Sequence, residues 1–177
     1  NDWVSCLGGH EQVKTPHIDR LARQGVSFTN AHRQAPICVP SRTSMLTGTY
    51  PWRNGVYMIE QNPREAPAIA DTLTIPQYFR YHGYHTMGVG KIYHRAQGDA
   101  DAWDHWGGRH GWSWMVKRAG PEGVSGLPNP QIFDFGPIPA EDTEMSDMKH
   151  AESAVERLRE DHDKPFFLAV GLITPHL

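Results

Sequence analysis

The sequence has few cysteines, no long apolar run and no cluster of basic residues, and each absence excludes a class of protein. Two cysteines among 177 residues, Cys6 and Cys38, are too few for a disulfide-stabilised scaffold, and we expect both to be unpaired. No run of about 18 apolar residues is present, so the sequence predicts no transmembrane helix and no membrane partner. The 17 Lys and Arg residues are scattered and the formal net charge is −3, which argues against a nucleic-acid partner.

The length and the two ends of the sequence bear on whether it is a whole protein or a part of one. A chain of 177 residues with 38% hydrophobic content fits one domain-sized core, or part of one. The chain starts at Asn1 instead of Met, and it stops at Leu177 directly after an apolar run. We therefore expect a piece of a longer protein, incomplete at both ends and inactive on its own. A targeting leader would lie outside this sequence.

Helices and short apolar strands alternate along the chain. Thr15 followed by Pro16 is typical of a helix start, and Gly25 of a helix end. Apolar residues from Met145 to Leu158 recur at helical spacing, and the apolar run at 166–171 predicts a fully buried strand. The predicted helices cover residues 15–24, 38–48, 74–83 and 143–160, and the predicted strands cover 26–28, 84–89 and 166–171. This order predicts an α/β fold with a mostly parallel mixed sheet sandwiched by helices, and with ligand sites at the carboxyl ends of the strands.

A stretch rich in Trp, Gly and Pro, from about 95 to 142, shows no clear period. A connection this long is usually functional or disordered, and its aromatic residues argue against disorder. The stretch contains four tryptophans, Trp103, Trp106, Trp112 and Trp114. Their rings could stack on sugar faces or could form a small core of the stretch itself, and the sequence leaves both alternatives open.

One short motif carries the strongest functional signal. It reads Cys38-Val39-Pro40-Ser41-Arg42, followed by Leu46-Thr47-Gly48. This pattern resembles the C-x-P-S-R-x-x-x-L-T-G element of the formylglycine sulfatases, which belong to the alkaline phosphatase superfamily. The segments 15–22, 25–31, 90–94 and 165–171, with Pro175-His176, are similar to other blocks of the same family. The resemblance covers most of the chain, implies an alkaline-phosphatase-like fold, and assigns residues 1–177 to the N-terminal part of a catalytic domain.

The physical setting of Cys38 agrees with the resemblance. A residue at the start of a helix faces free backbone N–H groups and the positive end of the helix dipole, which favour an anion such as a sulfate ester. In the family this cysteine is oxidised to formylglycine, whose hydrate offers one hydroxyl as the nucleophile and a second to expel the product. Arg42, one turn into the helix, can hold that hydrate with its fork of donors. The alternative is a buried small Cys38 and a surface Arg42.

Three further residues receive roles from the resemblance. Lys91 would bind sulfate oxygens, and His94 would take the proton of the hydroxyl that expels sulfate. Two residues separate Lys91 from His94, as in the iduronate-2-sulfatase-like branch, whereas many arylsulfatases have one. His176 would contact the sulfate and protonate the leaving oxygen. The alternatives are a solvated Lys91, a turn residue at His94 and an exposed loop residue at His176.

The resemblance also implies a calcium ion and a set of partners. Calcium takes six to eight oxygen ligands, of which Cys38, as formylglycine, would supply one; the carboxylate pairs that the family uses are absent from this sequence. The implied partners are a sulfated carbohydrate or small sulfate ester and the enzyme that generates formylglycine. The implied location is exported: periplasmic, secreted or lysosomal.

The predicted function is hydrolysis of a sulfate ester, most naturally on a sugar or polysaccharide. A phosphonate or phosphodiester hydrolase of the same superfamily is an alternative that the motif does not exclude. A thiol phosphatase would need Arg six positions after the cysteine, where this chain has Ser44. A noncatalytic carbohydrate-binding module would use the tryptophans but would leave the block from Cys38 to Gly48 unexplained.

Overall fold

A computed structural model describes residues 3–94, 99–111, 120, 122–127, 136–137 and 139–174. The chain divides into two compact units, Asn1–Arg33 and Gln34–Leu177, and each is described by itself. Three residues with predicted roles, Trp112, Trp114 and His176, lie outside the described residues.

The first unit consists of a short 3₁₀ helix, η1 (Ser5–Leu7), and helix α1 (Pro16–Gln24). Asp19 links the two, because its carboxylate accepts hydrogen bonds from the Ser5 hydroxyl (2.7 Å) and the Cys6 amide (3.0 Å). These bonds lower the pKa of Asp19, with Ser5 as the largest cause. The predicted helix 15–24 is therefore confirmed, apart from its first residue.

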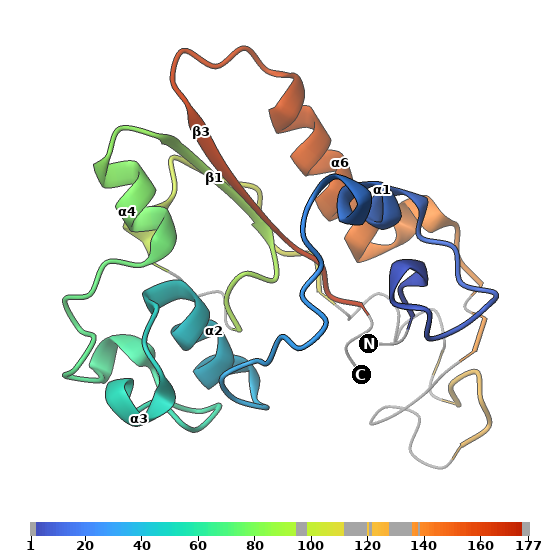
Figure 1. The fold of residues 1–177 in the computed structure, drawn as a ribbon, viewed down its shortest axis with the longest axis horizontal. Coiled ribbons are helices and arrows are strands. Elements are labelled where there is room, and N and C mark those ends of the chain that lie inside the picture. Colours follow the sequence, from blue (N-terminus) through green and yellow to red (C-terminus); the bar gives the residue numbers. More distant parts are fainter. Residues whose placement is uncertain are drawn as a thin grey trace. The chain divides into compact units, whose positions relative to one another are not determined.

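The second unit contains a parallel sheet with the strand order β2-β1-β3 (Figure 1). The strands are β1 (His85–Gly90), β2 (His105–Trp106) and β3 (Phe166–Gly171). The register pairs Gly88 with Trp106 and Gly90 with Gly171. All three strands therefore end at the same edge of the sheet, and the residues that follow them lie along that edge.

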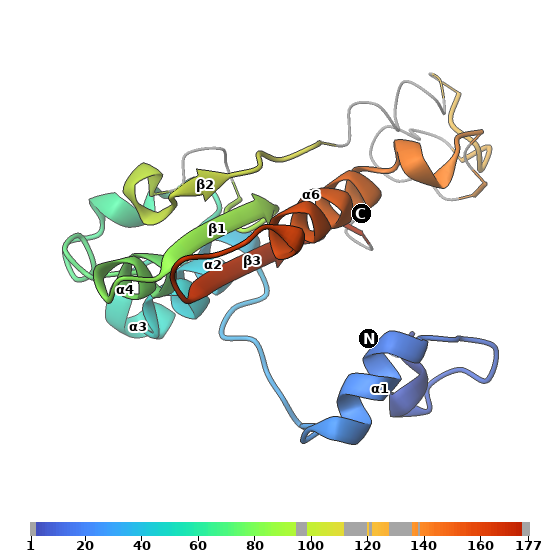
Figure 2. The same cartoon turned by 90° about the horizontal axis from the view of Figure 1, so that it is seen from above.

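Helices cover both faces of this sheet, as predicted (Figures 1 and 2). On one face lie α2 (Cys38–Thr47) and α4 (Ile75–Tyr81), and Leu46 of α2 shares a core with Ile92 and Trp103. On the other face lies α6 (Ser146–Arg159), which follows the short helix η4 (Asp142–Glu144). The α/β layer architecture was correctly predicted from the alternation of elements.

A second, smaller core fixes the far side of α2. Val39 packs with Val56 and Ile69, which follow α3 (Pro51–Asn54) and η2 (Pro63–Glu65). Since Val39 is the residue after Cys38, this core anchors the first turn of α2. The functional motif therefore begins on a helix that is held from two sides.

Two predictions about strands were wrong. Residues 26–28 form no strand, and Val26 and Phe28 are each 80% exposed, because this short segment has no pairing partner among the described residues. Strand β3 is not fully buried, since Phe166 is 40% and Val170 is 44% exposed. Within the described residues β3 is the edge strand of the sheet, so a continuous apolar run here does not mean burial on every side.

The described part of the Trp-rich stretch joins the sheet. It contains η3 (Ala100–Ala102) and β2. Trp103 is 9% exposed, and a β-carbon on Gly88 would lie only 2.8 Å from the Trp106 ring and 2.9 Å from that of Trp103. These two tryptophans pack on β1, so for them the core alternative is correct. The stretch also brings a second strand end to the edge where β1 ends.

Candidate functional site

The backbone of Lys91 is fixed by a close approach between two strand ends. Its amide donates a 2.6 Å hydrogen bond to the carbonyl oxygen of Gly171, at the end of β3. The preceding Gly90 has φ of 81°, and a β-carbon there would lie 2.1 Å from the Gly171 oxygen. A β-carbon on Gly171 would lie 2.3 Å from the carbonyl carbon of Lys91. Both glycines are therefore required for Lys91 to leave the sheet at this point.

Arg42 connects helix α2 to the same strand end. Its Nη1 donates to the carbonyl oxygen of Lys91 and, over 2.9 Å, to that of Ile92. Arg42 lies one turn after Cys38, the first residue of α2, whose N-cap Ile37 makes no side-chain capping bond. The helix start, with its unsatisfied N–H groups, is thus tied to the residue that follows β1.

The charges of Lys91, Arg42 and Cys38 influence one another. Burial lowers the pKa of Lys91, the nearby cations Arg42 and Arg109 lower it further, and Cys38 opposes the change. Burial likewise lowers the pKa of Arg42, against a hydrogen bond and an electrostatic attraction from Cys38. Lys91 is only 3% exposed, and among the described residues no side chain forms a hydrogen bond or ion pair with its ammonium group. A lysine at so little exposed a position, with two further cations nearby, favours the binding of an anion beside it.

His94 belongs to the same neighbourhood. Together with Arg42 it lines a cavity of about 100 Å³ beside α2. Tyr93 also lines this cavity, and burial raises its pKa to about 12. The carbonyl oxygen of His94 accepts a 2.6 Å hydrogen bond from Nη1 of Arg109. The structure therefore brings Cys38, Arg42 and Lys91 together, and it places His94 with Arg42 at a cavity that neither Cys38 nor Lys91 lines.

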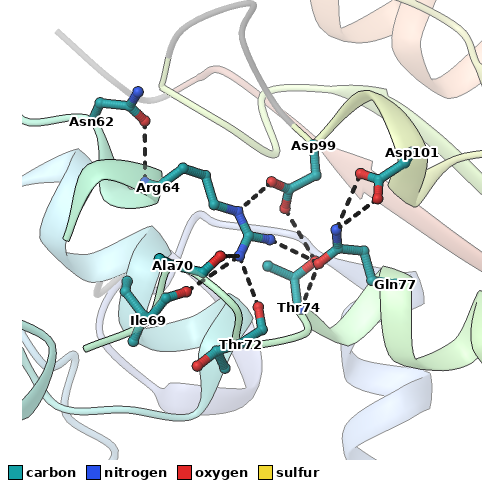
Figure 3. A network of polar contacts seen from close by, with 9 residues as sticks. All are labelled: Asn62, Arg64, Ile69, Ala70, Thr72, Thr74, Gln77, Asp99 and Asp101. Carbon is teal, nitrogen blue, oxygen red and sulfur yellow. Dashed lines mark hydrogen bonds and ion pairs between the residues drawn. The ribbon is translucent and has the colours of Figure 1, made fainter. Parts of the chain in front are cut away.

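Arg64 supports the wall of this cavity (Figure 3). Its Nε donates to Asp99 over 2.6 Å, and its Nη2 donates to Gln77 over 2.7 Å. Its Nη1 reaches three backbone carbonyl oxygens, of Ile69, Ala70 and Thr72. One guanidinium thus joins the loop before α4, the helix itself and the segment that precedes η3.

The described residues do not form a calcium site by themselves. None of their His, Cys, Asp and Glu side chains gather in a group of three or more that could hold a metal ion. At most, an oxygen on a modified Cys38 would be one ligand, where calcium takes six to eight. We therefore derive no catalytic step through a metal.

Two residues near the site were not predicted from the sequence. Arg109 follows Gly108 just after β2, and His150 lies in α6 with no exposed surface. A signal for Arg109 does exist in the sequence, because Gly108-Arg109 repeats the pattern of Gly90-Lys91. His150 carries no such signal, since nothing in its neighbours marks it as buried.

Comparisons with known proteins agree with this fold and show the family. A family model described as Sulfatase matches residues 2–177, and the chain therefore belongs to the sulfatase family. A curated sulfatase of Formosa agariphila is 34% identical and covers all of this chain, which matches 37% of that protein. Iduronate 2-sulfatases of Mus musculus and Homo sapiens are 32% and 31% identical over the whole chain, which matches 34% of each. The chain thus spans about a third of the length of these relatives.

Solved structures share the fold. A protein in complex with its substrate D-glucosamine-2-N,6-O-disulfate has a TM-score of 0.64 at 22% identity, over 99% of this chain and 32% of that protein. A phosphonate monoester hydrolase of Agrobacterium radiobacter has the same TM-score and identity, over 99% of this chain and 39% of that one. Both confirm the alkaline-phosphatase-like α/β architecture. Among the described residues, no helix is long and apolar enough to span a membrane.

Proposed function

We propose that the whole protein hydrolyses a sulfate ester on a sugar or polysaccharide, with a nucleophile made by oxidising Cys38 to formylglycine. The observation that carries the proposal is Lys91, 3% exposed and without an acidic partner among the described residues, whose charge interacts with that of Cys38 at the start of α2. An anion at this point would receive a full positive charge together with free helix N–H groups. Sulfated-sugar substrates are named for relatives, among them an N-acetylgalactosamine-6-O-sulfatase of Bacteroides thetaiotaomicron.

Each residue has a defined task in this proposal. Lys91 neutralises the sulfate oxygens, and Arg42 orients the hydrate of the modified Cys38 from one turn further along the helix. One hydroxyl of the hydrate attacks sulfur, and the bond from sulfur to the alcohol oxygen breaks. His94 takes the proton of the second hydroxyl, which allows sulfate to leave and the aldehyde to form again.

Two parts of the proposal concern groups outside the described residues. His176 is proposed to give its proton to the departing alcohol oxygen. The family resemblance also implies calcium, whose remaining ligands this part of the chain does not supply. An enzyme that generates formylglycine and an exported location are further predictions from the same resemblance.

The test uses the whole protein, co-expressed with a formylglycine-generating enzyme. We expect the peptide that contains Cys38 to lose the mass difference between a thiol and an aldehyde, and we expect hydrolysis of sulfate esters in preference to phosphate or phosphonate esters. Cys38→Ala should abolish turnover while leaving the melting temperature unchanged. Active protein with only unmodified Cys38 would contradict the mechanism, and a preference for phosphonate esters would favour the alternative hydrolase.

A further inference from the structure

Two neighbouring strands end in the same way at the edge where the site lies. Strand β1 ends at Gly90, with φ of 81°, and Lys91 follows; the chain after β2 turns at Gly108, with φ of 78°, and Arg109 follows. The Gly90 amide donates a 2.8 Å hydrogen bond to the Gly108 carbonyl oxygen, so the two turns are adjacent. Two parallel strands thus present a cation each at matching positions.

Arg109 is held on both sides along its backbone. The preceding Gly108 is bonded to Gly90, and the following His110 donates its amide to Nε2 of the buried His150 over 2.9 Å. The guanidinium then extends to the carbonyl oxygen of His94, to which Nη1 donates over 2.6 Å. This is its only hydrogen bond among the described residues, and one bond uses one of the five donors of a guanidinium.

The three cations at this edge, Lys91, Arg42 and Arg109, have no acidic partner among the described residues. Arg42 donates to backbone carbonyl groups, Arg109 to one carbonyl group, and no carboxylate forms an ion pair with either or with Lys91. Burial is the main cause of the lowered pKa values of Lys91 and Arg42, and Arg109 lowers both further by electrostatic repulsion. A sulfate monoester carries one negative charge, and Lys91 together with the positive end of the α2 dipole already balances this charge. The third cation exceeds what one sulfate ester requires.

We propose that Arg109 binds a second anionic group of the substrate, a carboxylate or a further sulfate close to the scissile one, and so selects dianionic sugars. This inference rests on the proposed function. A guanidinium group can donate two parallel hydrogen bonds to the oxygens of a carboxylate or of a sulfate. Charged hydrogen bonds of this type are about twice as strong as neutral ones. A purely structural role, in which Arg109 only holds the His94 carbonyl, would affect all substrates alike.

The variant Arg109→Gln removes the charge and, because glutamine is shorter, also the bond from Nη1 to the His94 carbonyl oxygen. The comparison of substrates separates the two roles, since loss of the structural bond affects all of them alike. The substrates are monosulfated hexoses, the matching disulfated hexoses and the matching sulfated hexuronates. We expect the ratio of kcat/KM for dianionic over monoanionic substrates to fall about tenfold or more, the loss expected for one charged hydrogen bond. A selective loss on disulfated hexoses identifies the second group as sulfate, and one on hexuronates identifies it as carboxylate.

Arg53→Gln is the matched control, since the Arg53 side chain is exposed and forms no hydrogen bond or ion pair among the described residues; its ratio should equal that of the wild type. Binding of the same sugars in a Cys38→Ala background, measured by calorimetry, tests Arg109 without turnover. Equal losses on all three substrates, or no change in the ratio and in binding, would overturn the inference. A wild-type protein that hydrolyses no sulfate ester would instead contradict the proposed function, and the binding measurement would still decide the role of Arg109.

Discussion

The backbone amide of His110 donates a 2.9 Å hydrogen bond to Nε2 of His150, a side chain with no exposed surface. Nε2 must therefore be unprotonated, which places the proton of the neutral ring on Nδ1, 3.5 Å from Oδ1 of Asp147. Protonation of Nε2 would set two donors against each other. The segment that carries Arg109 is thus attached to α6 through a histidine that must stay neutral.

This relationship predicts a loss of stability in mild acid. Burial lowers the pKa of His150 below its ordinary 6.5; His110 and Arg109 act in the same direction, and Asp147 opposes them. Below pH 6.5 the histidine takes up a proton in the unfolded chain but not yet in the folded one. The free energy of unfolding is therefore highest above pH 6.5, and it decreases as the pH falls from 6.5 toward the lowered pKa of the folded state. Asp147, whose pKa is lowered, titrates only in stronger acid.

The measurement is the free energy of unfolding between pH 7.5 and pH 5 for the wild type and for His150→Gln, whose side-chain oxygen can accept the His110 bond. We expect a smaller pH dependence in the variant. His17→Gln, at an exposed histidine, is the control and should keep the wild-type slope. Identical slopes in all three proteins would show that His150 is not the titrating group.

Lys91 should separate activity from stability. Replacing it by Met approximately keeps the volume of the side chain but removes its charge. The lowered pKa of Lys91 shows that folding disfavours the charged form. We expect kcat/KM for a sulfate ester to fall about 100- to 1000-fold, as for loss of one electrostatic donor, with urea stability unchanged or higher. Lys149→Met, at an exposed lysine, should change neither. Retained activity with lower stability would make Lys91 a structural residue.

Gly171 should tolerate no side chain. In Gly171→Ala the new β-carbon would lie 2.3 Å from the Lys91 carbonyl carbon, and backbone atoms cannot yield as a flexible side chain can. We expect a destabilisation of about 1–3 kcal/mol, as for other overpacked sites, together with lower activity because Lys91 is displaced. Gly25→Ala is the control, since its nearest contact is an ordinary 3.4 Å. Equal melting curves for both variants would contradict the close approach.

Arg64 should matter more than an ordinary partly exposed arginine. Arg64→Leu would remove one donor from the Asp99 carboxylate and one from each of three carbonyl groups, although Asp99 keeps Thr74 and Ile69 keeps the Thr72 amide. Because Arg64 is 30% exposed, water replaces part of what is lost, and we expect about 1–3 kcal/mol of destabilisation. Arg53→Leu, at an exposed side chain with no hydrogen bond or ion pair among the described residues, should stay within about 0.5 kcal/mol. Denaturant unfolding of the three proteins makes the comparison.

The sequence predicted what local signals encode. The motif around Cys38 and Arg42 is contiguous in the sequence. The helix that carries it, and the position of Cys38 at the start of that helix, could therefore be predicted from Pro40 and Gly48. Lys91 followed from a strand that ends in glycine. Their meeting could not be predicted in detail, because the bonds from Arg42 to the residues after β1 join distant parts of the chain.

The residues that were missed lack local signals strong enough to find them. Strand β2 is two residues long, too short for alternation to reveal it, so Arg109 could not be placed at a strand end. In α6 the apolar spacing favoured the face of Met148 and Leu158, which are 39% and 54% exposed, whereas the structure buries Ser146, His150 and Ala154. Which face of a helix is buried depends on its neighbours, and hydrophobicity alone gave the wrong face here.

The bond from the Lys91 amide to Gly171 also sets an order of events during synthesis. The chain is made from the N-terminus, so Cys38, Arg42 and Lys91 all leave the ribosome before the strand that fixes Lys91 in place. At translation rates of about 5–20 residues per second, the interval between Lys91 and Gly171 lasts several seconds. Throughout that interval Cys38 lies in a chain in which the proposed anion site is still incomplete, and an enzyme that modifies the thiol would meet Cys38 without the folded site around it.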